Sequence, residues 1–153
     1  MDAPSKTNLE LIFSIACIGF GILVACFLSP KDRYFLGNMA IFWLPQAAIL
    51  LCMWLLGSRP SVISGVALIL SLYLAAFGVF TFYNSGPDAS MAWLGYLFSL
   101  PGAGIGALIG IAIIKLRKIH AAAVAGVVSA ICTFVGLAIN QAALCNTVLY
   151  CGL

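Results

Sequence analysis

The stretch PGAGIGALIG, residues 101–110, places Gly102, Gly104, Gly106 and Gly110 inside a long apolar segment. Glycine-rich stretches either cradle a phosphate or let two helices pack closely. A dinucleotide site needs its glycines between a strand and a helix, and a P-loop ends in Gly-Lys-Ser or Gly-Lys-Thr. Here the flanking residues are apolar on both sides, and the whole segment is long enough to cross a bilayer. The stretch therefore predicts helix packing inside a membrane.

The composition of the chain supports this interpretation. Hydrophobic residues make up 64% of the 153 residues and charged residues only 7%, whereas soluble domains have about 45–50% and about 25%. A water-soluble fold cannot cover its surface with so few charges. Mean hydropathy is +1.18, which is typical of a chain that lies mostly in lipid.

Apolar runs long enough to span a membrane, roughly 20 residues each, recur along the sequence. The five runs cover residues 9–28, 34–56, 61–83, 91–114 and 119–144. We expect each to be a helix, because lipid offers no partners for backbone N–H and C=O groups. The predicted fold class is all-α: residues 1–153 form a single transmembrane domain, an integral membrane helical bundle with five transmembrane helices and short loops.

Basic residues predict the orientation, since Lys and Arg accumulate in cytoplasmic loops. Five spans would place most of the basic residues on one side, namely Lys6, Arg59, Lys115, Arg117 and Lys118. The other side would carry only Lys31 and Arg33. We therefore expect a cytoplasmic N-terminus and a periplasmic C-terminus, in a bacterial inner membrane. The net charge of +3 is then explained by topology and anionic lipid headgroups, and no nucleic-acid partner is expected.

The glycines of the fourth run form a ladder at helical spacing. Gly102, Gly106 and Gly110 recur every four residues, so they share one helix face. The fifth run repeats small residues at the same spacing: Ala122, Gly126 and Ala130. Two uses remain open, a tight hairpin within the chain, or a face on which a second copy or a membrane-protein partner docks.

Buried polarity is carried by amides and hydroxyls. Pro45 and Gln46 lie near the middle of the second run, and Asn140 and Gln141 lie near the outer end of the fifth. They either form hydrogen bonds between helices or contribute to a solute site. In the second case Pro45 would break its helix and free carbonyls beside Gln46, as broken helices do in transporters.

Two cysteines follow the last span. Cys145 and Cys151 fall on the side predicted to be oxidising, so they form a candidate disulfide. We expect no metal site there, because neither a histidine nor a further cysteine accompanies the pair.

Catalytic groups are sparse in this sequence. The spans carry essentially no ionisable residue of the kind that marks proton relays and ion pathways. The single histidine, His120, lies beside Lys118 without a carboxylate or nucleophile nearby in the sequence. We therefore predict no enzyme activity, no catalytic residues and no cofactor.

The predicted function is contact between helices. The preferred interpretation is a small polytopic membrane protein that acts as an accessory or assembly subunit, or as an immunity protein against a membrane-inserting toxin. The alternative is an oligomeric channel or carrier for a small neutral solute.

Overall fold

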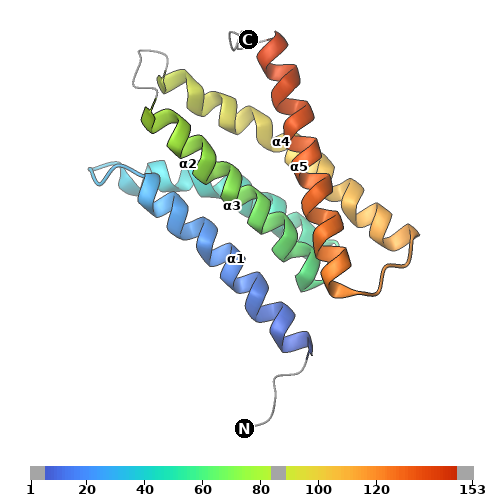
Figure 1. Ribbon diagram of the computed structural model, residues 1–153. Coiled ribbons are helices and arrows are strands. Elements are labelled where there is room, and N and C mark those ends of the chain that lie inside the picture. The colour runs from blue at the N-terminus through green and yellow to red at the C-terminus, as the bar shows by residue number, and fades with distance from the viewer. Residues whose placement is uncertain (1–5, 84–88, 148–153) are drawn as a thin grey trace.

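The computed structural model describes residues 6–83 and 89–147, and in these ranges the chain forms five α-helices and no strand (Figure 1). The helices are α1 (Lys6–Leu28), α2 (Phe35–Leu55), α3 (Pro60–Tyr83), α4 (Ala89–Leu116) and α5 (Ala122–Thr147). Each contains an apolar segment long enough to cross a membrane. The prediction of an all-α bundle with five spans is confirmed, and the chain is an integral membrane protein by this measure.

Helix α3 is the centre of the bundle. It contacts the other four helices, and its residues Ser61–Ala67 are buried without interruption. The most extensive contact between two helices joins α4 to α5, followed by the contact of α1 with α3. Half of the apolar segment is buried in α3 and in α4, against 17% in α2. Helices α3 and α4 are therefore the inner helices, and α2 lies at the periphery.

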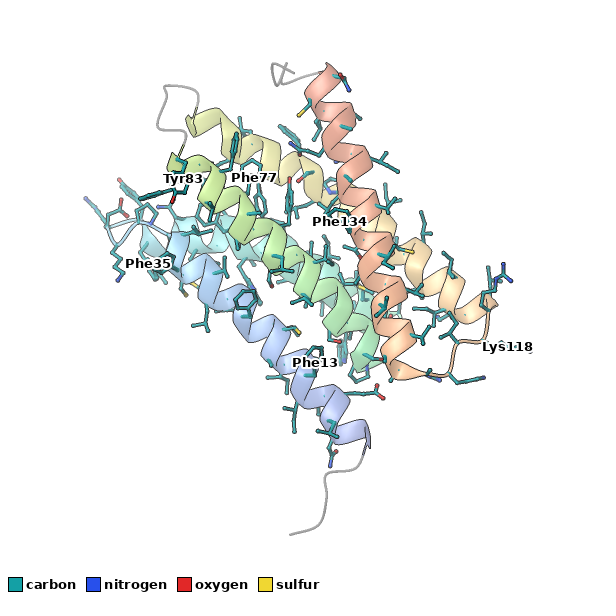
Figure 2. All side chains as sticks on the ribbon, viewed as in Figure 1. Phe13, Phe35, Phe77, Tyr83, Lys118 and Phe134 are labelled. Atoms are coloured by element: carbon teal, nitrogen blue, oxygen red, sulfur yellow. The ribbon has the colours of Figure 1, made fainter. Side chains whose placement is uncertain are left out.

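The outer surface is apolar, as lipid contact requires. Phe13 on α1 and Phe134 on α5, both labelled in Figure 2, are 57% and 59% exposed. The start of α1 and the end of α5 lie at opposite ends of the bundle in Figure 1, as an odd number of spans requires.

Two helices end in the same hydrogen-bonded motif. At the end of α2, Gly57 has a φ of 68°, and the N–H of Ser58 donates to the carbonyl of Met53 at 3.1 Å. At the end of α4, Lys118 has a φ of 48°, and the N–H of Ile119 donates to the carbonyl of Ile114 at 3.0 Å. Both are Schellman turns, which reverse the chain in few residues.

The second of these turns precedes a boundary that differs from the prediction by three residues. We predicted that the fifth helix begins at residue 119, whereas α5 begins at Ala122. The turn at Arg117 and Lys118 ends α4, and residues 119–121 then connect it to α5. The left-handed backbone of Lys118 is rare for a lysine. Nothing in the sequence marks it, because glycine is the usual signal for such a turn.

Candidate functional site

The glycine face of α4 packs against α5. A Cβ atom added to Gly106 would meet the backbone carbonyl of Cys132, and one added to Gly102 would lie 2.5 Å from the carbonyl oxygen of Gly136. Gly110 continues the same face. The two backbones therefore touch, with no room for a side chain between them. Such close approach favours dispersion and weak Cα–H···O contacts, which hold helices together in lipid.

The opposing face of α5 is not the one formed by Ala122, Gly126 and Ala130. Residues Ser129, Cys132, Gly136 and Asn140 meet the glycines of α4. Ala122 and Ala130 are half-buried. The glycine face of α4 is thus occupied within the chain and does not offer a free surface to a partner.

Gly126 contacts α3 instead of α4. A Cβ atom at Gly126 would lie 2.9 Å from the carbonyl oxygen of Ser61, and one at Gly65 would meet the carbonyl of Gly126. The hydroxyl of Ser129 also donates to the carbonyl of Val62 at 3.1 Å. Because α5 packs against both α3 and α4, its small residues serve two interfaces.

Gln46 lies at the junction of three helices. Its side chain is 2% exposed. Its Nε2 donates to the hydroxyl of Tyr96 on α4 at 2.7 Å, and to the carbonyl of Leu70 on α3 at 3.4 Å. The Tyr96 hydroxyl in turn donates to the carbonyl of Phe42 at 2.9 Å. These bonds tie α2, α3 and α4 together inside the apolar core.

Aromatic rings extend this junction toward α5. The rings of Tyr73 and Tyr96 stack with centroids 5.7 Å apart, and the Tyr73 hydroxyl donates to Oε1 of Gln141 at 3.1 Å. Phe77, labelled in Figure 2, packs on Tyr96 with ring centroids 5.9 Å apart. One line of polar and aromatic contacts thus runs from Gln46 to Gln141. Asn140 is separate from this line, since its Nδ2 donates to the carbonyl of Phe98 at 2.6 Å.

This arrangement favours interhelical hydrogen bonding over a solute site. Pro45 lies inside α2, and the helix continues through it from Phe35 to Leu55. The amide of Gln46 already donates to Tyr96 and Leu70. A solute would have to displace these bonds in order to reach the amide.

A shallow groove lies on the opposite side of α4 from the glycine face. The groove, which we call the α2–α4 groove, has a volume of about 260 Å³ and is lined almost wholly by apolar atoms of Ala48, Ile49, Cys52, Met53, Gly104 and Leu108. A Cβ atom added to Gly104 would meet only Ile49 Cγ1, at 3.8 Å. The groove therefore has room for atoms from outside the chain.

Cys145 is disulfide-bonded, whereas Cys17, Cys26, Cys52 and Cys132 are free. Cys151 lies outside the described residues, so its pairing with Cys145 stays a prediction.

No protein-family model matches this chain, and comparisons with curated proteins and with solved structures give no match either.

Proposed function

We propose that this protein is a non-catalytic accessory subunit of the membrane, which holds an apolar helix of another membrane protein in the α2–α4 groove. Assembly of a complex and immunity against a membrane-inserting toxin are both contact functions of this kind. The observation that supports the proposal is the groove itself. It is apolar, it is open at Gly104, and it is formed by two transmembrane helices.

Small residues on its two walls suit the groove to a helix. Ala48 and Cys52 are four residues apart on α2, and Gly104 lies on the facing wall of α4. In lipid, small residues at this spacing let a second backbone approach closely, and van der Waals packing then drives association. The buried polar groups of Gln46 and Tyr96 bond to one another and are not offered to a partner. Binding of a partner helix would therefore depend on how well its shape fits the groove.

Filling the groove tests the proposal. We expect Gly104→Leu to fold, since its first side-chain atom meets only Ile49 at 3.8 Å, and to lower partner capture at least tenfold. A photo-crosslinking residue at Ala48 reports the capture in living cells. The matched control is Gly19→Leu, because a Cβ atom at Gly19 has nothing within 4 Å.

The proposal predicts one discrete crosslinked protein that persists in Gly19→Leu and is lost in Gly104→Leu. A crosslink to a second copy of this chain would instead identify a homo-oligomer. Crosslinks to lipid alone, or equal capture by both variants, would contradict the proposal.

We also infer that the N-terminus is cytoplasmic in a bacterial inner membrane. The links that carry Arg59 and Arg117 lie at one end of the bundle, and Arg33 lies in the link between α1 and α2 at the other. A membrane-impermeant maleimide should label Arg33→Cys in intact cells, and should label Arg117→Cys only after permeabilisation. The reverse pattern would invert the topology. The unsubstituted chain gives the background.

A further inference from the structure

A basic pocket lies where two links meet at one end of the bundle. The link between α2 and α3, the link between α4 and α5 and the adjoining helix ends line an open cavity of about 330 Å³. Arg59, Lys115, Lys118 and His120 line it, and we call it the basic pocket. Lys118 is labelled in Figure 2, where it lies in the α4–α5 link at the edge of the bundle.

Among the residues that the structure describes, the charges in the basic pocket have no counter-ion within it. None of its lining residues is acidic. Arg59 donates from Nη1 to the carbonyl oxygen of His120 at 3.2 Å, which joins the two links but neutralises no charge. Three cationic side chains therefore surround one cavity. Such a constellation attracts an anion, and Arg and Lys are the side chains that bind phosphate most effectively.

A buried hydroxyl lacks a partner beside these charges. Ser58 lines the basic pocket, and its Oγ is buried without a hydrogen-bond partner among the described residues. Ser61, in the first turn of α3, has an Oγ in the same state. Buried hydroxyls are normally paired. Helix α3 begins at Pro60, between these two serines in the sequence. The dipole of a helix favours negative charge at its N-terminal end.

The depth of the basic pocket is apolar. Val62, Ile111 and Ile114 line it and are 3%, 8% and 9% exposed, whereas the four basic side chains are all exposed. Cations thus lie above a floor of branched aliphatic groups. This polarity matches the region of a phospholipid where the phosphate meets the acyl chains, and the position at the end of four spans matches the headgroup level.

We propose that the basic pocket binds the phosphate of an anionic phospholipid headgroup, with Arg59, Lys115 and Lys118 as its charged ligands. Inorganic phosphate shares the ligand chemistry but leaves the floor of the pocket empty. Basic pockets between transmembrane helices are a recurrent mode of lipid recognition. The backbone of Lys118 is left-handed, with a φ of 48°. Glycine adopts this conformation more easily than lysine does.

Lipid binding to the purified protein tests this site. Native mass spectrometry in detergent would compare phosphatidylglycerol, phosphatidylcholine and inorganic phosphate as probes. We expect phosphatidylglycerol to bind most tightly, and Arg59→Gln, Lys115→Gln and Lys118→Gln each to weaken it about fivefold, which corresponds to the loss of one cation near an anionic headgroup. Lys31→Gln and Arg33→Gln, at the opposite end of the bundle, are the matched controls and should bind as the wild type does.

Lys118→Gly separates binding from folding. Glycine relieves the left-handed backbone, so the variant should unfold at the same temperature as the wild type or higher, yet bind phosphatidylglycerol about fivefold more weakly. Equal loss in the control variants, or unchanged binding in all of the pocket variants, would overturn the site. Binding of inorganic phosphate without preference for phosphatidylglycerol would overturn its assignment to lipid.

Discussion

Alanine at position 106 is expected to force α4 and α5 apart and to destabilise the bundle by about 1–3 kcal/mol or more, the range for overpacked cores. The added Cβ would meet the carbonyl oxygen of Cys132, and would lie 3.0 Å from its carbonyl carbon and from Thr133 Cα. All three are backbone atoms of a helix, so no change of rotamer relieves the clash. Only a shift of a whole helix can make room.

Gly104→Ala is the matched control for this prediction, two residues away on the same helix. Its Cβ would meet Ile49 Cγ1 at 3.8 Å, an ordinary van der Waals contact. We expect no loss of stability there, and a small gain from the better helix propensity of alanine. Unfolding by sodium dodecyl sulfate in mixed micelles, followed by circular dichroism, would measure both variants. Equal effects at positions 104 and 106 would contradict the packing described for α4 and α5.

The spans are predictable from sequence because the bilayer fixes their length. Each predicted run agrees with its helix to within three residues at either end. Which face of α5 meets α4 is not predictable in this way. Gly126 and Gly136 both belong to series of residues four apart, which share a helix face. Periodicity places residues on a face but does not say which neighbouring helix that face meets, and α5 has two neighbours here.

The polar junction was predictable only in part. Gln46 is conspicuous because it is an amide inside an apolar run, and the structure buries it. Tyr96 and Tyr73, its links toward α5, were missed by sequence reasoning. The available signal was that a buried tyrosine hydroxyl needs a partner. Similarly, the sequence presents Arg59 and Lys115 only as charges that set the membrane orientation. That they line one pocket depends on how the two links pack against each other.

Tyr96 is expected to be the most sensitive position of the polar junction. It is fully buried and is the largest of the fully buried side chains among the described residues. Tyr96→Ala would leave a cavity among Phe77, Tyr73 and Gln46, and we expect a loss on the order of 3 kcal/mol. Tyr96→Phe keeps the ring but removes the 2.7 Å partner of Gln46. The amide would then keep only its 3.4 Å contact with Leu70, and we expect a loss of about 1 kcal/mol.

A double-mutant cycle separates the hydrogen bond from the packing of the ring. Tyr96→Phe leaves the amide of Gln46 without its partner at 2.7 Å. Gln46→Leu removes that amide altogether. The double variant should therefore be less destabilised than the sum of the two single variants, by roughly 1 kcal/mol. Detergent-induced unfolding measures all four proteins, and Tyr83→Phe, at an exposed tyrosine on α3, controls for loss of a hydroxyl. Strict additivity would mean that Gln46 and Tyr96 do not stabilise the bundle through their mutual bond, and α2 would then be held at this junction by ring packing and by the separate bonds to Leu70 and Phe42.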